Sequence, residues 1–182
     1  MATHHSATID DLYREEGKAE LVNGEIVRMS PAGRGHGRAA AMILGSLLAR
    51  EKSHQLPGTS FGDGVGFLCN LPNRQSFSPD VAYYTGPVSG SEDFLPQAPD
   101  FAAEVRSKGD YGPAAEREIS DKRGEYFAAG TKVVWDVKLR TGEVWVFRAT
   151  DPDKPTVYRR GEVAEAEPAV PGWTMPVDEL FE

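Results

Sequence analysis

Three polar residues stand where polar side chains are costly. Asp80 follows Pro79 and introduces the apolar run VAYY, and Glu104 lies inside a second apolar run, FAAEV. Lys122 lies in the segment AAEREISDKRGEYFAAG, which reads as a helix. A carboxylate that is removed from water must be paired, protonated or bound to a metal. The simplest site that uses both acids is a divalent metal ion held by Asp80 and Glu104.

These residue types fit chemistry on a phosphate ester. Ions such as Mg²⁺ prefer oxygen ligands and keep several waters, so two carboxylates and a backbone carbonyl supply half of a shell. The bound ion polarises a phosphoryl oxygen and lowers the pKa of a bound water. A nearby lysine can orient that water and neutralise charge that develops on phosphorus. On the expected helix, Lys122 lies at the border of a face that carries Ile119 and Tyr126.

The elements that must position these residues are strands and helices of one α/β or α+β domain, with a central mixed sheet flanked by helices. Asn23-Gly24 lies between two apolar-containing runs and predicts an N-terminal β-hairpin. The pattern predicts helices over residues 8–17, 38–52 and 113–130, and strands over 65–70, around Asp80 and Glu104, and over 132–139, 142–149 and 156–161. Strand alternation would turn Phe101, Ala103 and Val105 to one side, and Ala102, Glu104 and Arg106 to the other.

Length and composition indicate a single domain over residues 1–182. The chain is 40% hydrophobic and 26% charged, which is ordinary for a globular protein and argues against global disorder. We expect disorder in residues 1–7, which include His4 and His5, and a C-terminal tail, 162–182, packed on the domain. No apolar run approaches the roughly 20 residues that cross a bilayer.

The cysteine content and the net charge indicate where the protein is located and what it binds. The single cysteine, Cys69, excludes an internal disulfide and a thiolate zinc cluster, and the first residues hold no apolar signal core, so we expect a cytoplasmic protein. The net charge of −8 argues against tight non-specific DNA binding by a monomer, although basic residues can still gather on one face. The sequence leaves open whether the protein forms a homodimer.

Three segments together resemble a known family. SPDVAYY, PDFAAEVRS and DKRGEYFAAGTKVVWDV resemble the active-site core of the PD-(D/E)xK nuclease superfamily, and more narrowly the Uma family of restriction-endonuclease-like proteins in bacteria. The AELVNGEIV hairpin and the helix that His36 leads match the usual opening of that family, so the resemblance spans roughly residues 9–147. It implies a restriction-endonuclease-like fold, a divalent metal ion (Mg²⁺ or Mn²⁺) and hydrolysis of DNA phosphodiester bonds.

The resemblance also assigns roles to residues. Asp80 matches the motif aspartate and Glu104 the second acid, so both would be catalytic and would hold the metal. The superfamily lysine normally stands two residues after the second acid, where this chain has Arg106. Arginine stays protonated and cannot act as a base. Lys122 matches the relocated lysine of the family and is the third catalytic residue, while Arg106 would contact phosphate or a neighbouring acid.

Each candidate also has a structural explanation. Asp80 could bond a turn amide, Glu104 could pair with Arg106 on a solvated face, and Lys122 could be a surface lysine. Among weaker candidates, Glu20 and Glu25 flank the hairpin turn, and we expect both to be solvated. Glu20 could reach the metal only if the hairpin packs over the end of the sheet.

His36 and Asp136 are two further polar candidates, and the sequence is compatible with two functions. His36 could bind phosphate or cap its helix, and Asp136 is expected to be structural. The first function is a Mg²⁺-dependent DNA endonuclease. The second is a catalytically silent nucleic-acid-binding or assembly module on the same fold, which the net charge of −8 favours.

Overall fold

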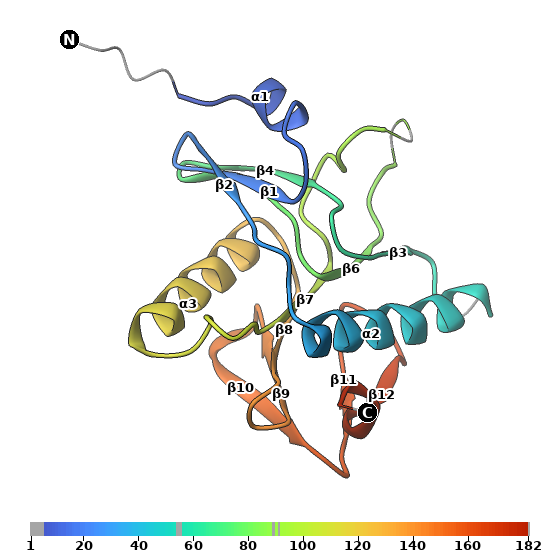
Figure 1. The fold of residues 1–182 in the computed structure, drawn as a ribbon. Coiled ribbons are helices and arrows are strands. Elements are labelled where there is room, and N and C mark those ends of the chain that lie inside the picture. Colours follow the sequence, from blue (N-terminus) through green and yellow to red (C-terminus); the bar gives the residue numbers. More distant parts are fainter. Residues whose placement is uncertain (1–5, 54–55, 89, 91, 182) are drawn as a thin grey trace.

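A computed structural model of the chain describes residues 6–53, 56–88, 90 and 92–181 (Figure 1). His4 and His5 therefore lie outside the described residues. In chain order the elements are α1 (Ile9–Tyr13), β1 (Ala19–Val22), β2 (Glu25–Arg28), α2 (Arg34–Lys52), β3 (Thr59–Phe61), β4 (Phe67–Leu71), β5 (Arg74–Phe77), β6 (Val81–Tyr84), β7 (Phe101–Val105), α3 (Pro113–Ala128), β8 (Val133–Lys138), β9 (Glu143–Arg148), β10 (Asp151–Arg159), β11 (Val163–Glu165), β12 (Thr174–Pro176) and the 3-10 helix η1 (Val177–Leu180).

The main sheet has the strand order β10-β9-β8-β7-β6-β3. Strands β7 and β8 are parallel, and the other neighbours are antiparallel. A parallel pair needs a crossover connection, which α3 supplies between β7 and β8. The sheet is therefore mixed, as the sequence predicted.

The N-terminal hairpin is confirmed, but it belongs to a second sheet with the order β2-β1-β5-β4. Its turn has positive φ at both central residues, 52° at Asn23 and 72° at Gly24. These angles are those of a type I′ turn, which matches the twist of the two strands that it joins. In Figure 1 this second sheet lies beside one end of the main sheet.

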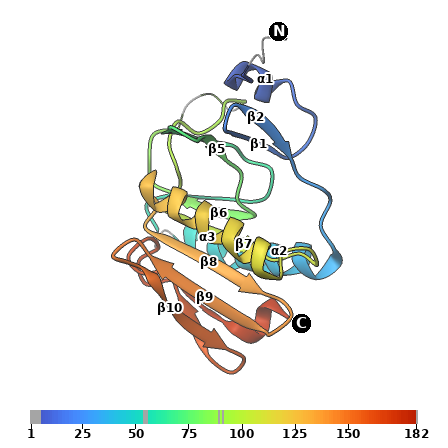
Figure 2. The same cartoon turned by 90° about the vertical axis from the view of Figure 1, so that its left-hand side faces the viewer.

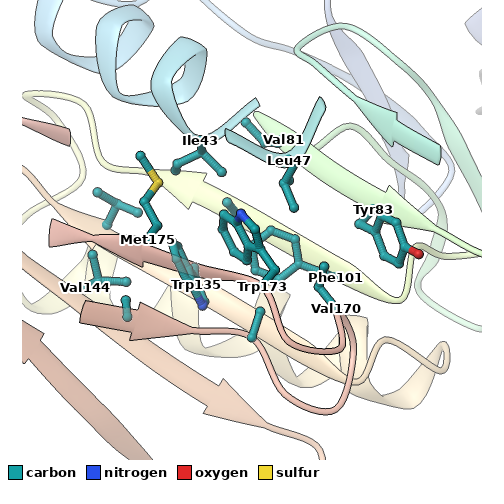
Figure 3. Close-up of a cluster of buried hydrophobic side chains, with 14 of the residues drawn as sticks. Ile43, Leu47, Val81, Tyr83, Phe101, Trp135, Val144, Val170, Trp173 and Met175 are labelled. Carbon is teal, nitrogen blue, oxygen red and sulfur yellow. The ribbon is translucent and has the colours of Figure 1, made fainter. Parts of the chain in front are cut away.

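The two long helices cover opposite faces of the main sheet, as Figure 2 shows. On the α2 side the buried side chains include Ile43 and Leu47 of the helix and Phe101 and Trp135 of the sheet (Figure 3). The other face packs beneath α3, where the fully buried Tyr126 stacks on Phe77 with ring centroids 4.1 Å apart. The main sheet is thus enclosed on both faces where it carries β6, β7 and β8.

The predicted alternation along β7 is confirmed. Phe101, Ala103 and Val105 belong to the core on the α2 side, whereas Ala102 lies in the core on the α3 side. Glu104 shares the α3 side, where it contacts Tyr126. The helix face expected from the sequence is only half confirmed, because Tyr126 is buried but Ile119 is partly exposed.

The C-terminal segment, residues 162–181, completes the core on the α2 side. Trp173 stacks on Trp135 with ring centroids 4.9 Å apart, and its indole nitrogen donates to Ser46 Oγ at 3.0 Å. The Trp135 indole nitrogen donates to the carbonyl of Glu165 at 3.1 Å. Met175 is also fully buried here (Figure 3).

Several boundaries differ from the sequence expectation, among them the end of the first helix, which lies at Tyr13 rather than residue 17. Helix α2 begins at Arg34 rather than residue 38, because glycines do not prevent a helix that tertiary packing stabilises. The edge strand β10 begins at Asp151 rather than residue 156 and includes Pro152 and Pro155. Proline is tolerated on an edge strand, where no neighbour needs its amide, and the register shifts between Asp151 and Thr156.

No helix in the described ranges is both long and apolar enough to cross a membrane.

Candidate active site

The register of β6 and β7 brings the two predicted acids together. These strands are antiparallel, with Val81 opposite Ala103 and Ala82 opposite Ala102. One further step along the same register sets Asp80 opposite Glu104. Residues that oppose each other in this way project from the same face of a sheet.

Asp80 is buried and surrounded by hydrogen-bond donors. Its Oδ1 accepts from Lys18 Nζ at 2.6 Å and lies 3.3 Å from His36 Nε2, while Oδ2 accepts from the backbone N–H of Val105 at 2.8 Å. Burial by itself would raise the pKa of Asp80, but His36 and Lys18 lower it to about 2. Asp80 is therefore ionised, and it bonds an amide of the neighbouring strand rather than of a local turn.

Glu104 forms an ion pair with Lys122, the lysine that the sequence motifs predict to be catalytic. Lys122 Nζ lies 2.8 Å from Glu104 Oε1, which also accepts from the Tyr126 hydroxyl at 2.7 Å. Burial raises the pKa of Glu104, and the nearby carboxylates of Asp80 and Glu20 add to the effect. Glu104 is 26% exposed, so it is neither fully buried nor on a solvated face.

Lys122 stands between two carboxylates rather than in open solvent. Its Nζ is also 2.9 Å from Glu20 Oε1, and its side chain is 20% exposed. Burial would lower the pKa of Lys122, but Glu104 and Glu20 outweigh burial and raise it. The lysine therefore carries a positive charge in this arrangement.

The expectation that Glu20 is solvated is wrong, whereas Glu25 is exposed as expected. Glu20 is only 3% exposed, and it pairs with Arg74 as well as Lys122. Its Oε1 accepts from the backbone N–H of Ser78 at 2.8 Å, just before Asp80 in the chain. Lys122 and Arg74 lower the pKa of Glu20 in spite of its burial. An acid within the short run AELV is the same signal that singled out Glu104.

Arg106 contacts neighbouring acids, which was one of its two expected roles. Its Nε and Nη2 donate to the two carboxylate oxygens of Asp136, each at 2.7 Å. Its guanidinium also pairs with Glu116 in the first turn of α3, and it donates to the carbonyl of Asp110 at 3.0 Å. With a side chain that is 2% exposed, Arg106 is unavailable to a phosphate. Asp136 is structural, as predicted.

His36 lies in the first turn of α2, but Gly33 occupies the N-cap position. The capping role proposed for His36 is therefore wrong. Its Nδ1 lies 3.2 Å from Ser107 Oγ, and its hydrogen bond with Asp80 raises the pKa of the imidazole. His36 thus contacts a predicted metal ligand from α2, whereas Glu104 lies on β7 and Lys122 on α3. Sequence patterns alone singled out neither this contact nor the one from Lys18.

An open cleft of about 1170 Å³ runs between the β1–β2 hairpin, β5 and α3. Glu20, Glu104 and Lys122 line it, together with Arg74 and Glu125. Asp80 is not among the lining residues and instead faces Lys18 and His36. Glu104 therefore lines the cleft, whereas Asp80 lies beside the start of α2.

The donor set fits a hard divalent ion that the protein holds by few ligands. Asp80 and Glu104 are adjacent carboxylates, and Mg²⁺ is usually bound by one or two carboxylates with waters filling the other positions. In the part of the chain that the structure describes, no group of three or more His, Cys, Asp or Glu side chains is arranged to hold a metal ion. An ion at Asp80 would also have to share its Oδ1 with the Lys18 ammonium group.

Comparisons with known proteins support the same kind of fold and family. The model of the Uma2 family, described as "Putative restriction endonuclease", matches residues 7–178. A crystal structure described as "a putative nuclease belonging to DUF820", from Anabaena variabilis ATCC 29413, superposes with a TM-score of 0.74. The two chains are 15% identical, and the match covers 96% of this chain and 97% of the other. No curated protein matches.

The structural likeness confirms a restriction-endonuclease-like fold, with a central mixed sheet and flanking helices. The family match begins before α1, ends within η1 and includes every element that contributes a residue to the candidate site. This extent confirms the resemblance found in the sequence motifs. The chain belongs to the Uma2 family of restriction-endonuclease-like proteins.

Proposed function

We propose that this protein is a divalent-metal-dependent endonuclease that hydrolyses DNA phosphodiester bonds with Asp80, Glu104 and Lys122. Its family and fold support a nuclease-like activity. The observation that carries the proposal is the convergence of the three side chains. Asp80, immediately before β6, lies opposite Glu104 of β7 when the register of the two strands is extended by one step, and Lys122 Nζ is 2.8 Å from Glu104 Oε1.

The charge states of these side chains suggest how they divide the work. A bound Mg²⁺ or Mn²⁺ ion at Asp80 and Glu104 would supply Lewis-acid polarisation of the phosphate and a water of lowered pKa. Lys122 stays protonated between two carboxylates, so it stabilises negative charge on a phosphoryl oxygen rather than accepting a proton. Glu20 holds the Lys122 ammonium group in place and is itself fixed by Arg74 and Ser78.

Cleavage of a plasmid in Mg²⁺ or Mn²⁺ tests the proposal. We expect Asp80→Asn and Glu104→Gln to abolish cleavage, and Lys122→Met to lower the single-turnover rate by about 10²–10³. Titration calorimetry with Mn²⁺ should show binding that Asp80→Asn removes and that Lys122→Met leaves. Lys52→Met, at the exposed far end of α2, is the matched control and should cleave like the wild type.

A catalytically silent module is the second candidate, because the Lys18 ammonium group already neutralises Asp80 and the net charge is −8. The same two measurements separate the candidates. A silent module would bind no ion that depends on Asp80, and it would leave supercoiled, linear and single-stranded DNA intact. Ion binding together with Asp80-dependent cleavage would exclude it.

A further inference from the structure

Three segments meet beside Asp80 at the start of α2. The start of α2 contacts the segment after β7, since His36 Nδ1 lies 3.2 Å from Ser107 Oγ. The β8–β9 turn joins them, because the Arg140 guanidinium donates to the carbonyl of Lys108 at 3.0 Å. Gly35 lies against Leu139, close enough that a methyl group on Gly35 would be 3.5 Å from Leu139 Cδ1. Figures 1 and 2 both show the start of α2 beside the segment that enters α3.

These segments carry a group of exposed cations, which we call the basic rim: Arg34, Arg38, Lys108 and Arg140. Within the described ranges, none of the four forms an ion pair with a carboxylate. Asp110, in the same segment, uses its Oδ2 to accept from the Ser107 backbone N–H at 2.6 Å. In a chain of net charge −8, the basic rim is a local concentration of positive charge.

The cleft on the other side of Glu104 is poorly suited to a polyanion. It is lined by seven acidic residues and four basic ones: Glu20, Glu104, Asp110, Glu118, Asp121, Glu125 and Asp136 against Arg28, Arg74, Arg106 and Lys122. All four basic residues already pair with carboxylates. A phosphate backbone that entered the cleft would meet an excess of negative charge.

We infer that the basic rim binds the phosphate backbone of the nucleic-acid substrate and that the substrate reaches Asp80 past the start of α2. His36 connects the two regions, because it contacts Ser107 beside the rim and lies 3.3 Å from Asp80 Oδ1. Backbone contacts of this kind orient a nucleic acid without reading its bases. The inference rests on the proposed nuclease function for the identity of the substrate, but it assigns binding to residues outside the catalytic cluster.

Binding without cleavage tests the rim separately from catalysis. The rim variant Arg34→Glu/Arg140→Glu is compared with Lys52→Glu/Lys154→Glu, which changes the net charge equally at exposed positions on the far end of α2 and on β10. Anisotropy of a short fluorescent duplex is measured in CaCl₂ and in EDTA, between about 50 and 200 mM KCl. A single strand of the same sequence forms a second arm.

The rim variant should bind the duplex at least about tenfold more weakly at low salt, and the slope of log K against log[salt] should become shallower by about 2. The control variant should match the wild type. The proposed role of the basic rim would be wrong if the rim variant bound as tightly as the wild type, or if the rim and control variants were weakened equally. Either result would leave the nuclease proposal standing. A wild type that binds and cleaves neither DNA form would remove both.

Discussion

At the scale of single residues, the two opposed acids differ because their neighbours differ. Asp80 is surrounded by donors, and its pKa is lowered to about 2. Burial and the negative charges around Glu104 raise its pKa, although Lys122 opposes the shift. The cation closest to Asp80 is Lys18, whose Nζ is 2.6 Å from Asp80 and 2.7 Å from Asp63. Lys18 thus stands where it would compete with a metal ion for the same oxygen.

Replacing Lys18 by methionine should therefore tighten Mn²⁺ binding at Asp80, by at least about tenfold, because a unit charge at this distance opposes a second cation. Titration calorimetry with the wild type and with Lys18→Met measures the difference, and Lys52→Met serves as the control. Weaker ion binding by Lys18→Met would instead mean that the ammonium group orients Asp80 for the metal.

At the scale of elements, Arg106 connects the end of β7 to β8 and to the start of α3. It donates to Asp136 on β8 through Nε and Nη2, and to Glu116 on α3 through Nη1 and the same Nη2. Lys122 is carried by α3, so the position of that helix decides whether the lysine reaches Glu104. Arg106 acts on the site through the placement of α3, and in the described structure it forms no hydrogen bond with the opposed acids.

Arg106→Met should destabilise the fold by about 3–5 kcal/mol, because Asp136 would remain buried without its partner. Urea unfolding in EDTA measures the loss. The double variant Arg106→Met/Asp136→Leu should recover most of it, since both charges are then absent. A single variant as stable as the wild type would show that the buried pair contributes little to holding β7, β8 and α3 together.

Asp100 connects the central strands at their other end. Its Oδ2 accepts from the backbone N–H and hydroxyl of Thr85, and its Oδ1 lies 2.7 Å from Lys132 Nζ. Burial would raise the pKa of Asp100, but Lys132 and Thr85 together lower it below its ordinary value of 3.8. A depressed pKa means that the stabilisation is present above pH 3.8 and is lost as the pH falls below it.

Asp100→Asn should lower stability at neutral pH by about 1–3 kcal/mol, since the ion pair and the charged hydrogen bonds are lost. Its stability should then fall less steeply than that of the wild type in acid, because the side chain no longer takes up a proton. Thermal unfolding between neutral pH and pH 3 compares the two proteins, with Asp153→Asn on the exposed β10 as control. If the stability of the two proteins fell equally steeply with decreasing pH, the lowered pKa of Asp100 would be contradicted.

At the scale of the whole molecule, the two faces of the main sheet are closed by different parts of the chain. One face receives α3 directly after β7, whereas the other needs both α2 and the C-terminal segment. Trp173 is central to that second face, because it stacks on Trp135 and packs edge-on against Phe101. The strands that carry Asp80 and Glu104 share this core through Val81 and Val105.

Trp173→Ala should cost about 3–5 kcal/mol, as expected for removal of a large buried aromatic side chain. Val163→Ala is the control from the same segment, because Val163 is 52% exposed and should change stability by less than about 0.5 kcal/mol. Urea midpoints with unchanged slopes would measure both effects. A small loss in Trp173→Ala would mean that the C-terminal segment covers the core without stabilising it.

Local chemistry made much of this architecture predictable. Asn23-Gly24 has the conformational freedom that a tight hairpin turn requires, and alternation along FAAEV assigned Glu104 to its face correctly. Glu20 was not predictable in the same way, because its burial depends on β5 and α3, which pair with the hairpin from distant parts of the chain. The sequence motifs likewise indicate a relocated lysine but not the Lys18 and His36 contacts to Asp80, which only the tertiary structure creates.

The contacts around the acids join residues far apart in the sequence. Lys18 and Asp80 are separated by 62 positions in the sequence. Lys122 on α3 pairs with Glu20 on β1 across a still longer separation. Contacts of such long separation form late and slowly in folding. A chain leaving the ribosome would expose Asp80 and Glu104 long before Trp173 could close the sheet beneath them. The last part of the chain to be made therefore closes the core on the α2 side, and the sheet that carries Glu104 keeps its aromatic face open until Trp173 has been added.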